Sequence, residues 1–123
     1  MFNLQKPTVQ MLGRWQPWHD GHTALFKKAL LLTGQVVIMI RNMERENSNP
    51  FSHEVVIENI KKELFKEGYK YEDKYIIIVV PNIVDISYGR GVGYTFTEHD
   101  LGADVHKISA TDIRKKLKQK GEL

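Results

Sequence analysis

The sequence contains no cysteine, and this absence excludes disulfide bonds and thiolate metal sites. No apolar run approaches the roughly 18 residues that a membrane-spanning helix requires, and the longest, from Tyr75 to Val80, suits a buried strand. The N-terminus also lacks the basic and then apolar segments of a signal peptide. We therefore expect a cytoplasmic protein that makes no membrane contact.

A strong charge of one sign is absent too, because 18 basic and 15 acidic side chains leave a net charge of only +3. Much of the basic excess lies close to the C-terminus, at Arg114, Lys115, Lys116, Lys118 and Lys120. Such a cluster suits either a solvated helix face or attraction for a small polyanionic ligand. Nucleic-acid binding is not expected, because the charge is small and is not interleaved with aromatic residues.

The chain does contain enough apolar residues, 41% of the total, to bury a core, and its length suits one domain over residues 1–123. Strands are expected at residues 8–12, 35–40 and 74–80, with short additional strands at 94–97 and 105–108. Helices are expected at residues 21–32, 52–66 and 112–119. This alternation predicts an α/β fold, namely a single Rossmann-like domain whose parallel sheet is flanked by helices on both faces.

The segment Gly13-Arg14-Trp15-Gln16-Pro17-Trp18-His19-Asp20-Gly21-His22 lies between the first expected strand and the first expected helix. Its two histidines flank a glycine, so both imidazoles can lie at the helix N-terminus, where free N–H groups and the helix dipole favour an anion. A zinc ion shared by His19 and His22 is the alternative. No third ligand is evident nearby, so we predict no metal site made by the protein.

A second segment, Ile108-Ser109-Ala110-Thr111-Asp112-Ile113-Arg114, opens the last expected helix. Its hydroxyl and N–H groups can bind phosphate oxygens, and Arg114, about one turn into the helix, can reach back to the same phosphate. Taken alone, this segment would be interpreted as an ordinary helix cap followed by a solvated arginine.

Together the two segments resemble the signatures of the HxGH nucleotidyltransferase superfamily, which are His-x-Gly-His and a later Ile-Ser-x-Thr-x-Ile-Arg. The first loop is similar to the Gly-Arg-Phe-Gln-Pro-Phe-His of archaeal-type nicotinamide mononucleotide adenylyltransferases, and Asn49-Pro50-Phe51 is similar to a tripeptide of theirs. Cytidylyltransferases for glycerol phosphate or choline phosphate usually have a different first loop. They often also contain an Arg-Thr-x-Gly-Ile-Ser-Thr segment, which is missing here.

The resemblance implies an enzyme that transfers a nucleoside monophosphate, by our interpretation AMP from ATP, to an anionic acceptor such as nicotinamide mononucleotide. It implies Mg2+ with the triphosphate, and His19, His22 and Arg114 as catalytic residues. The residues implied to bind the nucleotide or its phosphates are Gly13, Arg14, Trp15, Gln16, Gly21, Ser109 and Thr111. For Trp15, packing in the core is the favoured interpretation.

The acceptor-binding residues are expected at the end of the second strand and in the glycine-rich segment after the third. They are Arg41, Asn42, Tyr88 and Arg90. The Gly89-Arg90 pair is similar to part of the Gly-Arg-Asp-His loop of ATP sulfurylases, although the Asp-His is missing. The alternatives are a cytidylyltransferase for a polyol or choline phosphate and a regulatory module that binds a nucleotide without catalysis. A homo-oligomer is expected by analogy only.

Overall fold

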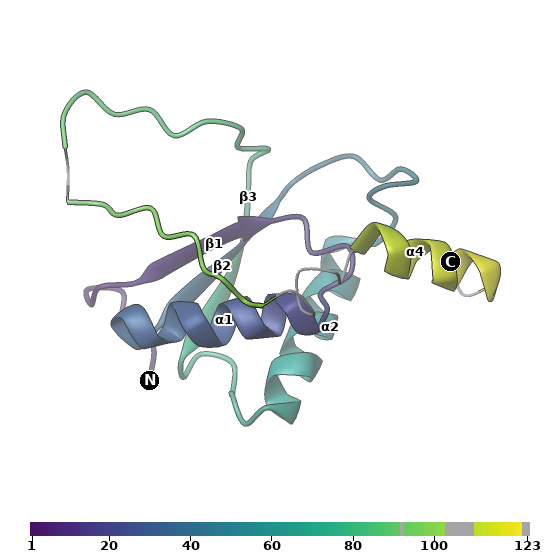
Figure 1. Cartoon of the computed structure of the whole chain (residues 1–123), viewed down its shortest axis with the longest axis horizontal. Coiled ribbons are helices and arrows are strands. Elements are labelled where there is room, and N and C mark those ends of the chain that lie inside the picture. The colour runs from purple at the N-terminus through teal and green to yellow at the C-terminus, as the bar shows by residue number, and fades with distance from the viewer. Residues whose placement is uncertain (92, 103–109, 122–123) are drawn as a thin grey trace.

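The computed structural model describes residues 1–91, 93–102 and 110–121, apart from the side chains of residues 110–112. In chain order the elements are β1 (Val9–Gly13), α1 (Asp20–Thr33), β2 (Val36–Arg41), α2 (His53–Lys66), β3 (Tyr75–Val80) and α4 (Ala110–Gln119). The three strands form one parallel sheet in the order β1-β2-β3, with Val9 opposite Val36 and Val36 opposite Tyr75 (Figure 1). The predicted α/β fold with a parallel sheet and flanking helices is confirmed.

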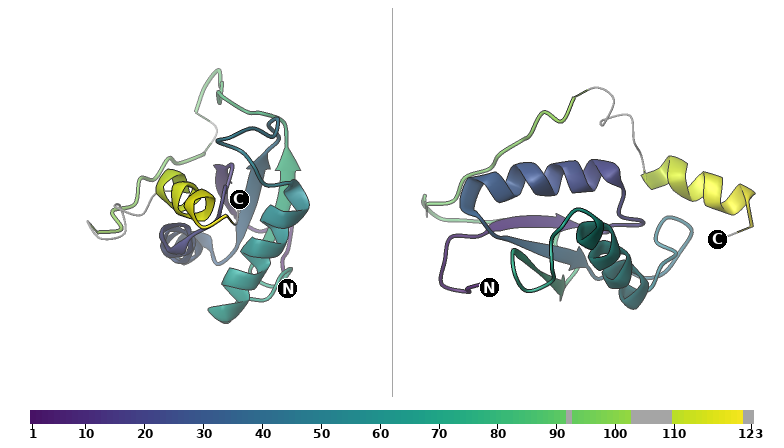
Figure 2. Two further views of the ribbon diagram at one scale, coloured as in Figure 1. Left: turned by 90° about the vertical axis from the view of Figure 1, so that its right-hand side faces the viewer. Right: turned by 90° about the horizontal axis from the view of Figure 1, so that it is seen from below.

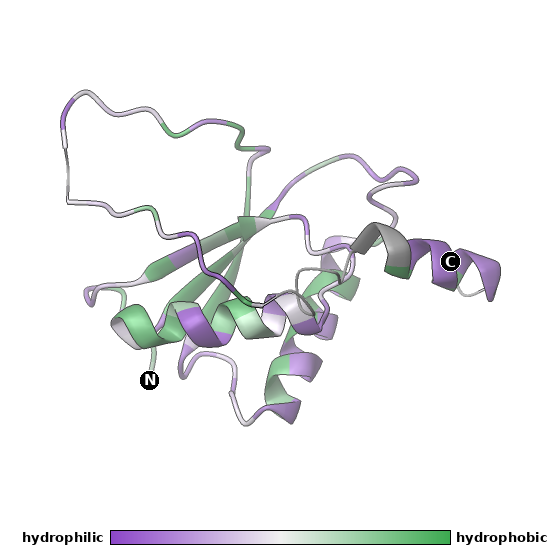
Figure 3. Ribbon diagram, in the orientation of Figure 1, coloured by the Kyte–Doolittle hydropathy of each residue, from purple (hydrophilic) through white to green (hydrophobic). Residues whose placement is uncertain are grey.

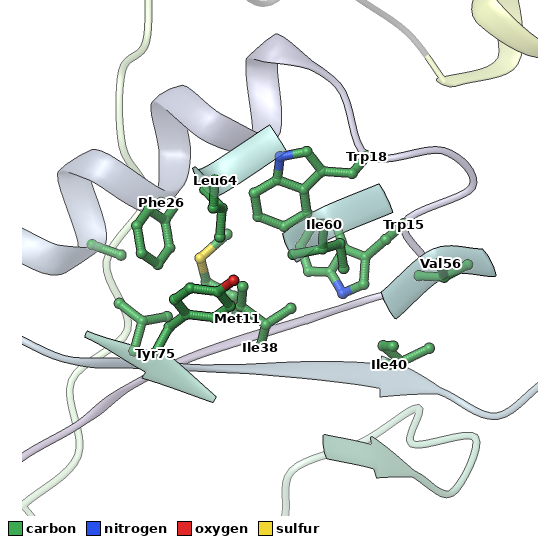
Figure 4. Packing of buried hydrophobic residues seen from close by; sticks show 12 residues of the cluster. Met11, Trp15, Trp18, Phe26, Ile38, Ile40, Val56, Ile60, Leu64 and Tyr75 are labelled. Atoms are coloured by element: carbon green, nitrogen blue, oxygen red, sulfur yellow. The ribbon is translucent and has the colours of Figure 1, made fainter. Parts of the chain in front are cut away.

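The core lies between one face of this sheet and two helices. Every second residue of β2 is buried on this face, at Val36, Ile38 and Ile40. Against them pack Phe26 of α1 and the Val56, Ile60 and Leu64 stripe of α2 (Figure 4). Both crossovers move one strand along the sheet in the same direction, and right-handed crossovers of that kind put both helices on one face. The expectation of helices on both faces is therefore wrong for α1 and α2.

Local signals explain where the two packed helices begin and end. Ser52 caps α2, since its hydroxyl accepts a hydrogen bond from the Val55 N–H at 3.3 Å. Gly34 ends α1 in the left-handed region, at φ 88°, and its N–H donates to the Leu30 carbonyl. Glycine adopts this conformation without the Cβ clash that other residues meet, so the chain can turn directly into β2.

The described part of the segment between β3 and α4 contains no helix or strand. The short strand predicted at 94–97 is wrong, because Tyr94 and Phe96 are 74% and 70% exposed and have no sheet to pack against. The strand predicted at 105–108 lies outside the described residues. The segment runs from β3 toward the end of α1 that is remote from α4, and then returns (Figures 1 and 2).

Helix α4 begins two residues earlier than predicted and projects beyond the body, near the N-terminal end of α1 (Figure 2). The coloured part of its ribbon is largely hydrophilic, in contrast to the strands (Figure 3). Among the described helices, none combines the length and the apolar character that crossing a bilayer would need.

Candidate functional site

The loop from β1 to α1 folds tightly around Trp15. Trp15 has a positive φ of 55°, and its indole lies so close to Gly13 that a Cβ there would meet it at 2.9 Å. The ring is buried, and its N–H donates to the Met39 carbonyl at 3.1 Å. Packing is therefore the role that the structure gives to the Trp15 ring, and Gly13 provides the space for it. A contact between either residue and a nucleotide stays a prediction.

The two histidines cap α1 reciprocally. Nδ1 of His19 accepts a hydrogen bond from the Gly21 N–H at 3.0 Å, and Nδ1 of His22 accepts one from the His19 N–H at 3.1 Å. This is the arrangement of a capping box, with imidazoles in place of the usual side chains. It stacks the two rings with their centroids 3.7 Å apart. Two residues that the sequence singled out for chemistry therefore also determine where the helix begins.

The same hydrogen bonds determine where each neutral ring carries its proton. Because both Nδ1 atoms accept, the proton of each neutral imidazole lies on Nε2. Burial and, as the smaller cause, the neighbouring His19 together lower the pKa of His22 to about 3. Burial also lowers the pKa of His19, although the Asp20 carboxylate acts in the opposite direction. At neutral pH the pair thus provides two Nε2–H donors that carry no charge.

Gln16 joins this loop to the segment that precedes α2. Its side-chain amide donates to the Phe51 carbonyl at 3.1 Å and accepts from the Phe51 N–H at 2.8 Å. Asn49, which is also buried, holds its own segment by donating to the Met43 and Glu44 carbonyls. The sequence drew attention to Asn49-Pro50-Phe51 by similarity alone, and did not indicate that Gln16 binds its backbone.

Arg114 of α4 reaches the same loop across 98 residues of sequence. Its Nη1 donates to the Gln16 carbonyl at 2.5 Å, and the side chain is 9% exposed. Burial lowers the pKa of Arg114, and the charge of Arg14 lowers it further. The structure therefore brings the Arg114 guanidinium to the loop that contains Arg14 and leads to His19 and His22. Ser109 and the side chain of Thr111 lie outside the described residues.

The residues expected to bind an acceptor are found in two different places. Arg41, at the end of β2, donates from Nη2 to the Asn82 side-chain oxygen at 2.8 Å, and the Asn42 N–H donates to the Val80 carbonyl. Asn82 was missed by the sequence analysis, because nothing local indicates that it meets Arg41. Tyr88 and Arg90 are exposed in the segment after β3, and no contact found in the structure joins them to the histidine loop.

The donors of this site suit an anion better than a resident cation. Among the described residues, no group of three His, Cys, Asp or Glu side chains is placed to hold a metal ion. The loop between β1 and α1, residues 14–19, contains no acidic side chain, and Asp20 is the first residue of α1. A divalent cation would fit here only when it is bound to a triphosphate, because the phosphate oxygens are the ligands that Mg2+ prefers.

The fold and the site together define a small parallel α/β protein in which the loop after β1 meets the last helix. Over 80 residues this chain is 32% identical to a nicotinamide-nucleotide adenylyltransferase of Methanococcus aeolicus, strain ATCC BAA-1280. The aligned region covers 63% of this chain and 46% of that relative, so the chain spans about half the length of the curated relative. No family model matches the sequence. The similarity supports a relationship to nucleotidyltransferases.

Proposed function

We propose that this protein is a nucleotidyltransferase that transfers AMP from ATP to a phosphorylated or otherwise anionic small acceptor. The observation that carries the proposal is the contact between Arg114 and the Gln16 carbonyl, because it unites two segments 98 residues apart in one cationic site. Arg14 and the neutral imidazoles of His19 and His22 complete this site. Cationic and N–H donors at a helix N-terminus favour polyphosphate binding.

In the proposed reaction an acceptor oxygen attacks the α-phosphorus of the triphosphate. A bond forms between these two atoms, the bond from the α-phosphorus to the bridging oxygen breaks, and pyrophosphate leaves with the electron pair. The chain mainly positions the reactants and stabilises charge. The Nε2–H groups of His19 and His22 bind the α-phosphate as its charge develops. The guanidinium groups of Arg14 and Arg114 bind the β- and γ-phosphates, and Mg2+ enters with the triphosphate.

The choice of ATP and of a first acceptor depends on the relative. Because that protein is named as a nicotinamide-nucleotide adenylyltransferase, nicotinamide mononucleotide is the first acceptor to test. Arg41 is the last residue of β2 and Asn82 follows β3, so both lie at the sheet edge where parallel α/β folds bind ligands. We assign the acceptor to this side of the site, with Asn42 beside it. Tyr88 and Arg90 remain predicted acceptor-binding residues, but they have less structural support than Arg41 and Asn42.

The test is release of pyrophosphate from each of the four ribonucleoside triphosphates, with Mg2+ and a panel of acceptors. The panel contains nicotinamide mononucleotide, glycerol 3-phosphate, phosphopantetheine, sugar phosphates and sulfate. His22→Ala should abolish release, whereas His53→Ala, which changes a histidine at the start of another helix, should leave it unchanged. Release with ATP and one acceptor would establish the adenylyltransferase. Release with CTP alone would establish a cytidylyltransferase instead, and tight triphosphate binding without any release would favour a regulatory module.

A further inference from the structure

A buried hydrogen bond lies directly behind the histidine pair and takes no part in capping the helix. The indole N–H of Trp18 donates to the hydroxyl of Thr23 at 2.8 Å, and both side chains are less than a tenth exposed. Trp18 belongs to the loop before α1, whereas Thr23 belongs to the first turn of the helix. The bond therefore fixes the ring of a loop residue against a rigid element.

The ring that is fixed in this way contacts His22. The centroids of the Trp18 and His22 rings are 5.4 Å apart, and Trp15 meets His22 edge-on at 4.8 Å. The two indoles also contact each other, with centroids 5.1 Å apart (Figure 4). With His19 stacked at 3.7 Å, three aromatic rings enclose the His22 imidazole. His22 is partly buried, so this packing shields part of the ring from water while Nδ1 accepts its backbone hydrogen bond.

We infer that Thr23 is a positioning residue, whose hydroxyl holds the Trp18 indole against His22 and so keeps His22 a neutral donor through Nε2–H. If the hydroxyl is removed, the Trp18 N–H has no partner in an apolar environment, and rotation of the indole toward water becomes favourable. Rotation opens one side of the enclosure, and solvent can then stabilise the protonated imidazole. The catalytic part of this inference rests on the proposed function, but the protonation state does not.

The charged groups around His22 are the smaller cause of its neutrality. On α1 itself, the charge of His19 opposes protonation of His22, and burial is the larger cause. Asp20 acts on His19 rather than on His22. From the loop, the charge of Arg14 acts on Arg114 of α4. A change that leaves all these groups in place and only opens the indole packing therefore tests the enclosure directly.

The experiment follows the imidazole resonances of the full chain by NMR between pH 2 and 8, with His22→Gln identifying the His22 signal. In the unmodified protein His22 should not titrate above pH 5. Thr23→Val and Trp18→Phe each remove the same hydrogen bond, and each should raise the titration midpoint by at least one unit. The double variant should show no larger shift than either single change, whereas Thr23→Ser should behave as the unmodified protein. Thr33→Val, which removes a threonine hydroxyl at the other end of α1, is the matched control.

Turnover gives a second and separable result. If the proposed reaction occurs, Thr23→Val should lower kcat for pyrophosphate release by roughly tenfold or more, with KM for the triphosphate little changed. The inference is overturned if His22 titrates identically in Thr23→Val and Trp18→Phe, or if Thr23→Ser is as perturbed as Thr23→Val. Should Thr23→Val fail to fold, Trp18→Phe decides the question alone. Absence of turnover with every acceptor would remove the proposed function and leave the NMR result standing.

Discussion

At the scale of single residues, the protonation of His22 is the property that links folding to the proposed chemistry. A protonated imidazole would lose its Nδ1 hydrogen bond with the His19 N–H, because Nδ1 would then carry a proton. The capping arrangement and the neutral state therefore require each other. A neutral Nε2–H donor can bind a phosphate oxygen without adding to the repulsion between the nearby guanidinium groups of Arg14 and Arg114.

The stability of the fold should consequently depend on pH below neutrality. The pKa of His22 is about 3 in the folded chain, against an ordinary value of 6.5, so the unfolded chain binds more protons between these limits. The free energy of unfolding should be greatest above pH 6.5 and fall as the pH is lowered, by up to about 1.4 kcal/mol per pH unit from this residue. Urea denaturation at pH 7.5, 6 and 5 measures the slope. His22→Gln should flatten it and His53→Gln should not; equal slopes in both variants would contradict this prediction.

Arg114 should contribute to triphosphate affinity through charge-assisted hydrogen bonds. Replacing it by methionine keeps most of the side-chain length and removes the guanidinium, so ATP binding should weaken by roughly tenfold to a hundredfold. Calorimetric titration with ATP and Mg2+ measures this loss. Lys115→Met is the matched control, because Lys115 is an exposed neighbour on the same helix and its charge is screened by solvent. Similar losses in the two variants would show that only the overall charge of α4 matters.

At the scale of elements, the site depends on how the loop after β1 is held between two other parts of the chain. The Gln16 side chain donates one hydrogen bond to the Phe51 backbone and accepts another from it. The main-chain carbonyl of Gln16 accepts a hydrogen bond from Arg114. The loop after β1 is thus held by the segment before α2 on one side and by α4 on the other. Displacing Gln16 would disturb both contacts at once.

Gln16→Met should therefore destabilise the fold although it keeps the size of the side chain. The Phe51 N–H and carbonyl would each lose a buried partner, and such losses cost roughly 1 to 3 kcal/mol. Chemical denaturation followed by circular dichroism measures the change. Gln10→Met, at an exposed position of β1, should change the free energy of unfolding by less than about 0.5 kcal/mol. If both variants were equally stable, the two hydrogen bonds to Phe51 would have no net value.

At this scale the sequence could predict only those features that depend on neighbouring residues in the chain. Alternation and helical spacing gave the three strands and the helices that flank them, because each pattern is contained in about ten consecutive residues. The pairs Gln16–Phe51, Arg41–Asn82 and Trp18–Thr23 could not be foreseen, since they depend on how elements meet in space. The strand at 94–97 failed for the same reason, because alternation alone does not provide a neighbouring sheet edge.

At the scale of the whole molecule, a compact body contrasts with the long segment that leaves it after β3. Residues 84–91 make no hydrogen bond to the body in the described structure, and Val84 and Tyr88 are 82% and 64% exposed. Gly89 and Gly91 flank Arg90, and a Cβ added at either glycine would meet no atom within 4 Å. A protease can bind such a chain in extended form.

Trypsin should consequently cleave first after Arg90. Residues 1–90 and 91–123 would result, which mass spectrometry distinguishes readily, and Arg90→Gln should abolish this early cut. Arg45, an arginine in another exposed loop, is held by two hydrogen bonds to the Pro50 carbonyl and should be cut later. If this segment binds the acceptor, as the sequence analysis predicts for Tyr88 and Arg90, ATP together with the acceptor should protect Arg90, while ATP alone should not. Protection by ATP alone would assign Arg90 to the triphosphate, and no protection by the pair would remove both residues from the acceptor site.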